Sequence, residues 1–443
     1  MYIHTTHDYQ MIIVRLKIFL KRGAGKMLLT RQEEDMASGK YGPGMEKSIK
    51  MLIKFGDIFK ADKLVKIASA HIMPKEPIEL LLELTEGVES TQVFTTTHPL
   101  MSAFDANKWQ KQGIDEEFGV REEALYKQRS AIYKRLGIYE TYTCLPMLAG
   151  NLPLKGQLIS WIGTGNQVLV NSLLGARTNR DGTVVNLCVA ITGRAPNLGL
   201  FLDENRYGQF LVNISSEINP RELSPIDVAA IGYYVGSRAG NYPVVIDGLP
   251  SDFSFDDIKG LVSLSTSGST CMCHIVGITP EAPDLKTALG GKKPKETLTI
   301  GKAEIQEAKA MYQKVGTFKV DMVIIGCPHC TIDDAKKIAS LLAGKKVGIN
   351  QRLWLGMGAQ TYTLAKIMGY TDIIERAGGV VANSCMATTP DSPLPKDVKV
   401  VASNSFKTAH YVTGLQKGKV QVVLGSLDDC INAAISGKME VKN

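Results

Sequence analysis

The pattern of apolar and polar positions divides the first third of the chain into short helices and strands. Residues 30–38 and 44–55 carry the spacing of helices, and residues 116–136 form a longer, highly charged helical stretch. Residues 64–68 and 92–97 are short apolar or β-branched runs, which are typical of strands. This part of the chain therefore predicts helices mixed with short strands.

The last third shows the clearest alternation of strands and helices. Strands are predicted at 320–325, 347–354 and 398–402, and helices at 331–343, 361–368, 371–377 and 426–436. This alternation indicates an α/β fold with mainly parallel sheet, and such sheets bind ligands outside the carboxyl ends of their strands. Residues 150–300 are rich in Gly, Asn and Thr, as in an α/β body with long loops, and residues 290–297 resemble a solvated turn.

Outside the N-terminus, composition and charge give little further information about fold or function. The chain has 443 residues and a net charge of +7, and residues 1–26 hold five basic residues against one acid. The rest of the chain is nearly balanced, which gives no argument for a nucleic-acid partner and is compatible with a small anionic substrate. Residues 11–20 are apolar but contain Arg15 and Lys17, so they are too short and too charged to span a membrane.

The first folded helix is expected to begin soon after Met27. Thr30 and Glu33 have the spacing of a capping box, in which the threonine hydroxyl and the glutamate carboxylate each accept a hydrogen bond from a backbone amide. No small-residue cleavage site follows the apolar segment, so a secretory signal is not expected. We therefore interpret residues 1–26 as an extension or a mis-called start, and we expect a cytoplasmic protein.

The cysteines lie at positions 144, 188, 271, 273, 327, 330, 385 and 430. In a long chain without an export signal they are expected to be reduced. Cys327-Pro-His-Cys330 follows a predicted strand, so it could be a redox pair, half a zinc site, or part of a metal site shared with distant cysteines. Cys144 and Cys385 lie in similar settings, and three thiolates can hold an iron–sulfur cluster whose fourth iron stays open. The other cysteines are assigned to packing.

Several longer strings together resemble the aconitase X family. They are Tyr142-Thr-Cys-Leu-Pro146, Leu174-Gly-Ala-Arg-Thr-Asn-Arg-Asp-Gly182, Thr192-Gly-Arg194, Glu204-Asn-Arg206, Gly326-Cys-Pro-His329, Ser384-Cys385 and Lys407-Thr-Ala-His-Tyr411. The resemblance implies an aconitase-like α/β fold of several subdomains with mainly parallel sheets. It also implies a hydro-lyase activity and a 4Fe-4S cluster on Cys144, Cys327 and Cys385. Finally, it implies a separate small swivelling subunit that closes the site and supplies a serine base.

The resemblance also implies substrate contacts. By position these fall at Ser69, Ala70, His71, His98, Pro99, Gly163, Thr164 and Lys407. Arg177 is a further candidate, because an arginine in a polar loop suits a carboxylate or phosphate, although it could equally form an internal ion pair. His71 could likewise be a structural histidine. The sequence departs from the family, which has Asn where His98 stands and Glu-Ser where Gly163-Thr164 stand.

We therefore expect a dehydratase of a small anionic hydroxy acid. The first substrate expected is (R)-5-phosphomevalonate, which would give anhydromevalonate phosphate, and cis-3-hydroxyproline or a related hydroxy acid is the alternative. A thiol-redox enzyme using Cys327 and Cys330 and a non-catalytic iron-sensing or scaffold relative are further alternatives. We expect an extension at 1–26, an N-terminal and central catalytic region at 27–300 and a C-terminal α/β subdomain at 301–443, with no nucleic-acid or membrane partner.

Overall fold

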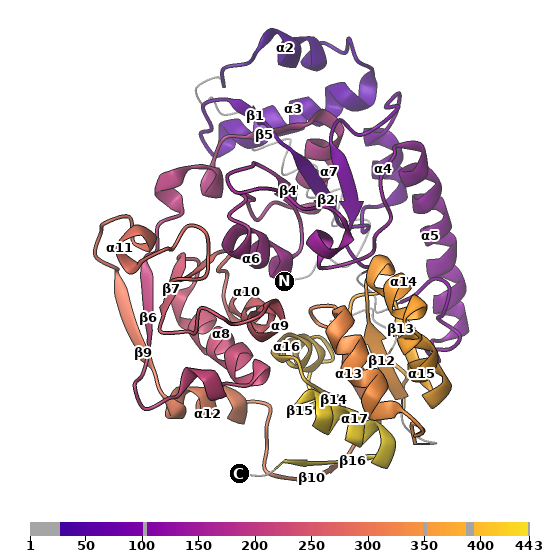
Figure 1. Cartoon of the computed structure of the whole chain (residues 1–443). Coiled ribbons are helices and arrows are strands. Elements are labelled where there is room, and N and C mark those ends of the chain that lie inside the picture. Colours follow the sequence, from indigo (N-terminus) through magenta and orange to yellow (C-terminus); the bar gives the residue numbers. More distant parts are fainter. Residues whose placement is uncertain (1–26, 101–103, 349–351, 387–393, 442–443) are drawn as a thin grey trace.

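The computed structural model describes residues 27–100, 104–348, 352–386 and 394–441. Three α/β regions follow one another along the chain and pack against each other (Figure 1). We call residues 27–205 the N-terminal region, residues 206–311 the middle region and residues 312–441 the C-terminal region. The largest hydrophobic core draws residues from all three regions, among them Tyr142, Ile231 and Ile324, so the centre of the molecule lies where the regions meet.

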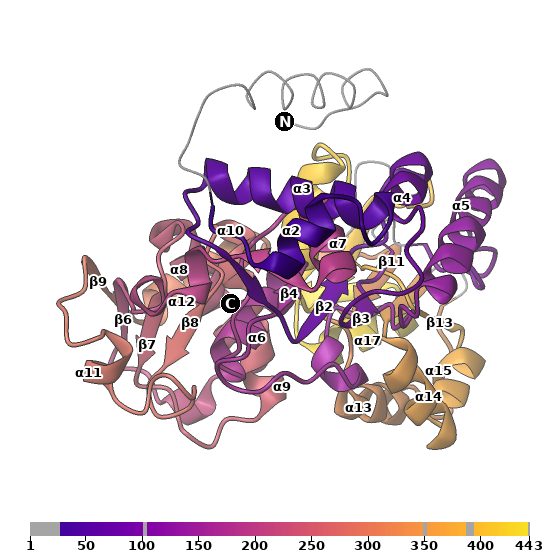
Figure 2. The same cartoon turned by 90° about the horizontal axis from the view of Figure 1, so that it is seen from above.

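The N-terminal region is built on a parallel sheet with the strand order β3-β2-β4. Its strands are β2 (Ser69–Ile72), β3 (Phe94–Thr97) and β4 (Ser160–Trp161), and its α-helices are α2 (Arg31–Ala37), α3 (Pro43–Ile58), α4 (Ile78–Leu84), α5 (Glu116–Arg135), α6 (Thr164–Leu173) and α7 (Thr183–Thr192). A separate antiparallel pair joins β1 (Leu64–Lys66) to β5 (Arg194–Pro196). Helix α7 packs on β2 and under α3, which encloses an apolar core on that face (Figure 2).

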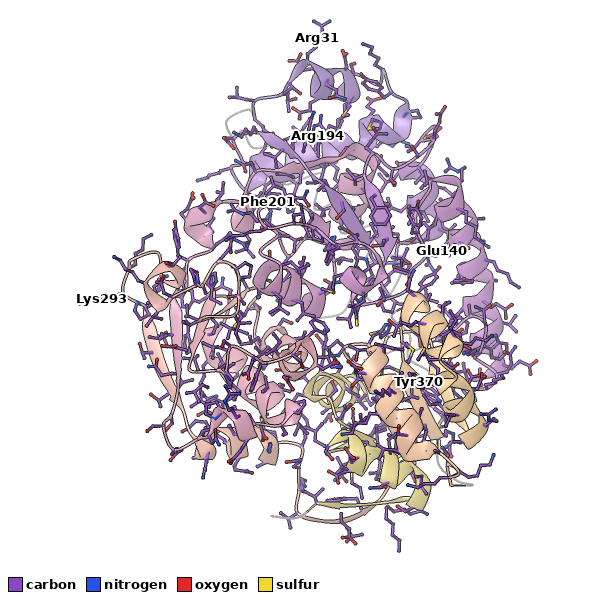
Figure 3. The ribbon with its side chains drawn as sticks, in the orientation of Figure 1. Arg31, Glu140, Arg194, Phe201, Lys293 and Tyr370 are labelled. Carbon is purple, nitrogen blue, oxygen red and sulfur yellow. The ribbon has the colours of Figure 1, made fainter. Side chains whose placement is uncertain are left out.

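Helix α2 begins where the capping box predicts. The Thr30 hydroxyl accepts from the Glu33 amide at 3.4 Å, and the Glu33 carboxylate accepts from the Thr30 amide at 2.8 Å. The same carboxylate pairs with Arg194 of β5 at 3.0 Å, and Arg194 lies beneath the helix that starts at Arg31 (Figure 3). The predicted start of the first helix is therefore confirmed. Residues 1–26 lie outside the described residues, and their interpretation as an extension stays a prediction.

The middle region contains a parallel sheet with the strand order β8-β7-β6-β9. Its strands are β6 (Phe210–Ile214), β7 (Val244–Asp247), β8 (Cys273–Ile275) and β9 (Glu296–Ile300), and its α-helices are α8 (Pro225–Ala239), α9 (Phe255–Ile258), α10 (Leu264–Ser267), α11 (Leu285–Ala288) and α12 (Lys302–Ala310). The solvated turn predicted at 290–297 is wrong at its end, because β9 starts at Glu296. This polar edge strand is stabilised by its backbone hydrogen bonds to β6, and its own sequence has no apolar pattern from which a strand could be predicted.

The C-terminal region contains a five-stranded parallel sheet with the order β13-β12-β11-β14-β15. Its strands are β11 (Met322–Ile325), β12 (Arg352–Gly356), β13 (Gly379–Ala382), β14 (Val400–Ser403) and β15 (Gln421–Leu424), and its helices are α13 (Ile332–Leu342), α14 (Ala359–Ile367), α15 (Tyr370–Ala377), α16 (Phe406–Leu415) and α17 (Leu427–Ser436). An antiparallel ribbon of β10 (Gly316–Lys319) and β16 (Lys438–Val441) lies beside it. Within the described ranges, no helix is both long and apolar enough to cross a bilayer.

Most of the predicted elements agree with the structure. The α/β fold with mainly parallel sheets is confirmed, since antiparallel pairing is confined to the β1-β5 and β10-β16 pairs among the described strands. The strand predicted at 347–354 agrees with the structure only at its end: β12 spans Arg352–Gly356, whereas Val347 lies outside any strand and its amide donates to the Ala377 carbonyl. Residues 349–351 lie outside the described residues. Helix α16 and strand β15 were not predicted. The division of the chain after residue 300 stays a prediction.

Candidate active site

Three cysteines that are far apart in the sequence line one small pocket. Cys144 lies just before the 3₁₀ helix η1 (Pro146–Ala149), Cys327 follows β11, and Cys385 lies beyond the end of β13. Strands β11 and β13 belong to the same parallel sheet, so their carboxyl ends open at one edge, where α/β proteins bind ligands. We call this the cysteine pocket. The structure thus brings together the three residues that the sequence proposed as metal ligands.

The pocket places these thiols in a buried environment. Burial and, after it, the neighbouring Cys327 raise the pKa of Cys144 to about 12, while the backbone amide of His329, which donates to the Cys144 sulfur at 3.1 Å, opposes this shift. Burial also raises the pKa of Cys327. Buried thiols with raised pKa values are poor free nucleophiles, and a nearby cation is needed to stabilise their thiolates.

Lys407 provides one such cation. It lies in the first turn of α16. Helix α16 lies between the middle and C-terminal regions (Figure 1), where it contacts α8 and α10 of the former and β14 and β15 of the latter. Burial alone would lower the pKa of Lys407, but the surrounding Cys327, Tyr411 and Cys144 leave it raised. Its ammonium donates to the hydroxyl of Thr164 at 3.0 Å. The pocket therefore carries a positive charge beside its three thiols.

The N-terminus of helix α6 also lines the cysteine pocket. Thr164 is the first residue of α6, its N-cap Gly163 has no side chain to cap the helix, and Gly165 lines the cysteine pocket. Backbone N–H groups at an uncapped helix N-terminus favour bound anions. Together with Lys407, this helix end makes the pocket suitable for a carboxylate or a phosphate.

Two histidines lie side by side next to the pocket. His98 lines the pocket and is 6% exposed, and its Nδ1 lies 3.3 Å from Nε2 of His71. His71 does not follow a strand, as the sequence suggested, but lies inside β2, and its Nδ1 lies 2.8 Å from the hydroxyl of Thr96. Burial lowers the pKa of His71 to about 3, and burial followed by the nearby charge of His71 lowers the pKa of His98. Both rings are therefore neutral near pH 7.

The remaining predicted contacts fall into two groups. Pro99 lines the cysteine pocket, whereas Ser69 and Ala70 are buried in β2 behind it, where the Ser69 hydroxyl accepts from Trp161 at 3.3 Å and the Ala70 carbonyl accepts from Asn151 at 3.0 Å. These two residues position the strand that carries His71. Arg177 is not among the residues that line the pocket.

Arg177 instead forms polar contacts within the protein. Its guanidinium pairs with Asp203 at 2.5 Å and donates to the Phe201 carbonyl at 2.7 Å, with Glu281 nearby. A guanidinium that is already paired has little capacity left for a substrate anion. The prediction that Arg177 binds substrate is therefore not supported by its position, and the internal ion pair that the sequence left open is what the structure contains.

The second cysteine of the Cys327-Pro-His-Cys330 motif does not line the cysteine pocket. Cys330 is 1% exposed and packs in the hydrophobic core of the C-terminal sheet, where burial raises its pKa. A redox pair needs an accessible thiol with a lowered pKa. All eight cysteines fall within the described residues and none forms a disulfide. The arrangement therefore does not favour the thiol-redox alternative.

Sequence reasoning did not assign a role to His329, although the residue lies inside the motif that drew attention to Cys327. Its ring is 1% exposed and lines the pocket, and its Nε2 lies 2.9 Å from the Ser384 carbonyl, next to Cys385. His329 thus ties the Cys327 loop to the Cys385 loop. Among the described residues, no three His, Cys, Asp or Glu side chains are arranged to hold one metal ion.

Comparisons with known proteins agree with this geometry. Family models described as the first, second and third domains of aconitase X match residues 26–204, 208–310 and 320–436. The phosphomevalonate dehydratase large subunit of Methanothermobacter thermautotrophicus is 33% identical over 408 residues, which cover 89% of this chain and 96% of that protein. The crystal structure of Thermococcus kodakaraensis aconitase X (holo-form) is 30% identical, covers 92% of this chain and 100% of its own, and gives a TM-score of 0.78.

A second kind of relative is longer than this chain. The cis-3-hydroxy-L-proline dehydratase of Pseudomonas aeruginosa is 28% identical over 415 residues, which cover 92% of this chain but 70% of that protein. Both kinds of relative are dehydratases, and the chain is accordingly a carbon–oxygen lyase. The three matched domains cover most of the chain and the solved structure has the same fold. The chain belongs to the aconitase X family.

Proposed function

We propose that this chain is the large subunit of a dehydratase that removes water from a small anionic hydroxy acid at an iron–sulfur cluster held by Cys144, Cys327 and Cys385. The observation that carries the proposal is the convergence of these cysteines, from three separate segments, on one pocket that also contains Lys407. The first substrate proposed is (R)-5-phosphomevalonate, and the product is anhydromevalonate phosphate.

The residues around the pocket fit such a cluster. Three cysteines line one pocket without forming a disulfide, and an amide donates to the Cys144 sulfur, as is common around iron–sulfur clusters. Metal binding would also provide the positive charge that these buried thiols need to stay deprotonated. When bound, an iron with an open coordination position supplies Lewis-acid chemistry for loss of a hydroxyl group.

The chain's own groups bind and orient the substrate. Lys407, held by Thr164, and the uncapped N-terminus of α6 attract a carboxylate or phosphate. Pro99, Val262 and Met386 line the pocket with apolar surface and help to exclude water. We assign no base to this chain. The base is proposed to come from a serine of a small subunit, as the family resemblance implies.

A separate small subunit is therefore part of the proposal. The relatives that match this chain over 95% or more of their own length are named large subunits, and the hydroxyproline dehydratases extend well beyond the matched part. The pocket lies where regions meet, so a further domain closing over it would complete the enclosure. Closure of such a site excludes water and brings a remote base to the substrate.

The choice of substrate rests on the charge of the pocket. No Asp or Glu is among the described residues that line the cysteine pocket, while Lys407 is. An amine-bearing substrate such as cis-3-hydroxy-L-proline would bring an ammonium group beside a lysine with no carboxylate to pair with, and an unpaired buried charge is costly. An anionic substrate without an amine avoids this cost. Hydroxyproline remains the alternative substrate.

The experiment is an anaerobic dehydration screen of the purified chain with and without the matching small subunit. The substrates are (R)-5-phosphomevalonate, cis-3-hydroxy-L-proline and a short series of other hydroxy acids. We expect iron on the chain alone, turnover only in the complex, and a preference for phosphomevalonate. Faster turnover of hydroxyproline would contradict the proposed substrate, and full activity of the isolated chain would contradict the proposed partner. Iron binding without turnover of any compound in the series would contradict the proposed substrate class.

A further inference from the structure

Four residues form a closed ring of polar contacts between the middle and the C-terminal regions. Asp256 lies in α9 and Lys259 starts the 3₁₀ helix η5, whereas Thr331 and Asp334 belong to the start of α13. Helices α9 and α13 lie beside each other in both views of the molecule (Figure 1, Figure 2). We call these four residues the polar ring. It crosses the boundary between two regions of the chain.

Each member of the polar ring contacts the next. The Thr331 hydroxyl donates to Asp256 at 2.9 Å, and the Asp256 carboxylate pairs with the Lys259 ammonium at 2.6 Å. The same ammonium donates to Asp334, whose carboxylate accepts from the backbone amide of Thr331 at 2.9 Å. A closed set of contacts is rigid, because no member can turn away without breaking two of them.

The polar ring is largely buried, so its charges depend on one another. The side chain of Lys259 is 14% exposed and that of Asp334 is 19% exposed. Burial alone would lower the pKa of Lys259, but Asp334 and Asp256 leave it raised, so the ammonium keeps its charge. Removing one member of a buried ion pair leaves the other charge uncompensated, which is strongly destabilising. Loss of the ammonium would leave two carboxylates side by side with no cation between them.

The polar ring is attached directly to the loop that carries Cys327. Thr331 is the N-cap of α13 and immediately follows this loop, which spans residues 326–330. Near its start the loop is tied within the C-terminal region, where the Ser405 hydroxyl donates to the Cys327 carbonyl. At its end it is tied to the middle region through the polar ring. The position of the loop therefore depends on contacts from both regions.

The polar ring and Cys327 also line the same small cavity. Asp256, Lys259 and Asp334 line it together with Cys327 and Lys407. The last two residues line the cysteine pocket as well, so they lie between the cavity and the pocket. Empty space resists movement less than packed side chains do. If the end of the loop were released, the cavity would give Cys327 room to move away from the other two cysteines.

We propose that Lys259 is a positioning residue for Cys327: through the other members of the polar ring it fixes the end of the Cys327 loop and keeps the sulfur in the cysteine pocket. The consequence for iron rests on the proposed function, because a site with three cysteine ligands needs all three sulfurs in place. The consequence for the loop does not rest on it and is measured on the iron-free chain.

The test compares Lys259→Met with Lys309→Met. Methionine keeps much of the length of lysine but removes its charge. Lys309 is the matched control, because its side chain is 15% exposed, it pairs with Asp227 inside the middle region, and it lines neither the cavity nor the cysteine pocket. Lys259→Arg keeps the positive charge between the two carboxylates and is the conservative variant that should restore the wild-type behaviour.

The first measurement is hydrogen exchange of the iron-free chain, read by mass spectrometry on the peptide that spans residues 326–335. We expect this peptide to exchange at least about tenfold faster in Lys259→Met than in the wild type, and close to the wild-type rate in Lys259→Arg and Lys309→Met. Alkylation of Cys327, which is 8% exposed, should accelerate in the same variant. Equal rates in Lys259→Met and Lys309→Met would overturn the positioning role.

Asp256→Ala keeps the test decisive if Lys259→Met does not fold. This variant removes the carboxylate that accepts from Thr331 but leaves Lys259 paired with Asp334, so no buried charge loses its last partner. The peptide of residues 326–335 should exchange faster than in the wild type. A wild-type exchange rate in Asp256→Ala would overturn the polar ring as the anchor of the loop.

Iron release separates this inference from the proposed function. Each full-length variant is loaded with iron anaerobically, and the loss of iron to bipyridyl is timed by absorbance. We expect release about tenfold faster or more in Lys259→Met than in the wild type, Lys259→Arg or Lys309→Met. If the wild type binds iron and Lys259→Met releases it no faster than Lys309→Met, the inference fails alone. If the wild type binds no iron, the proposed function fails, and hydrogen exchange decides the role of Lys259 by itself.

Discussion

Lys407→Met removes the positive charge of the cysteine pocket while keeping most of the side chain's volume. In the structure the ammonium donates to Thr164 at 3.0 Å and lies among Cys144, Cys327 and Cys385. A hydrogen bond from a charged donor contributes about 1.5–3 kcal/mol. If that interaction is made to the substrate's anionic group, its loss lowers kcat/KM by roughly 10- to 150-fold, at about 1.4 kcal/mol per tenfold.

The assay is steady-state dehydration by the iron-loaded complex, with iron content measured on each sample. Lys407→Arg keeps the charge with a different geometry and should lose less activity than Lys407→Met. Lys419→Met changes an exposed lysine that does not line the pocket and is the matched control. A kcat/KM within twofold of wild type in Lys407→Met, at normal iron content, would refute the reasoning. Loss of iron in that variant would show instead that the lysine acts through the cluster.

Three further predictions follow from the same structure. Replacing Cys144, Cys327 or Cys385 with serine should abolish iron binding, because a site with three ligands loses its geometry when one is removed. Cys188→Ser and Cys430→Ser are the controls and should retain iron. Iron retained in every pocket variant would refute the site. A chain that starts at Met27 should melt within a few degrees of the full chain, because Met27 is itself buried, at 7% exposure, and its amide donates to Asp57 at 3.1 Å, so the folded body begins at this residue. A large drop in melting temperature would refute this. The free energy of unfolding of the iron-free chain should fall as the pH decreases from 6.5, because the unfolded chain protonates His71 near its usual pKa while burial lowers the folded pKa to about 3. The slope of the unfolding free energy against pH is up to about 1.4 kcal/mol per pH unit for this one group. Denaturant unfolding at pH 7 and pH 5.5 measures the loss of stability between these two values, and this loss should be smaller in His71→Asn than in the wild type.

The sequence by itself determined the features that depend on neighbouring residues. The start of α2 was predictable because a capping box involves residues three positions apart. Helix α13 was predictable because its apolar positions repeat with the turn of a helix, and α5 was predictable because it is a long run of charged, helix-forming residues. Strand β11, and with it the position of Cys327 after the strand, was predictable because a short unbroken apolar run is typical of a buried strand. The polar strand β9 was not, because its stability comes from pairing with β6 rather than from its own pattern.

The arrangement of the candidate site could be determined only from the tertiary structure. The sequence and its family resemblance named Cys144, Cys327 and Cys385, but only packing of the N-terminal region on the C-terminal sheet shows that they line one pocket. The same packing leaves Arg177 in an internal ion pair away from that pocket. Spatial proximity across more than a hundred residues is set by the summed packing of the regions, and no local spacing records it.

His98 and Gly163 show this limit most clearly. In the sequence they are two separate departures from a family pattern, and each taken alone suggests a loss. In the structure a Cβ atom at position 163 would lie 2.5 Å from Cε1 of His98, so the ring fills the space that the glycine leaves, because strand β3 and the start of helix α6 meet beside the pocket. Residue identity determined what each position could contain, and the distance between the two backbones decided that they share one space.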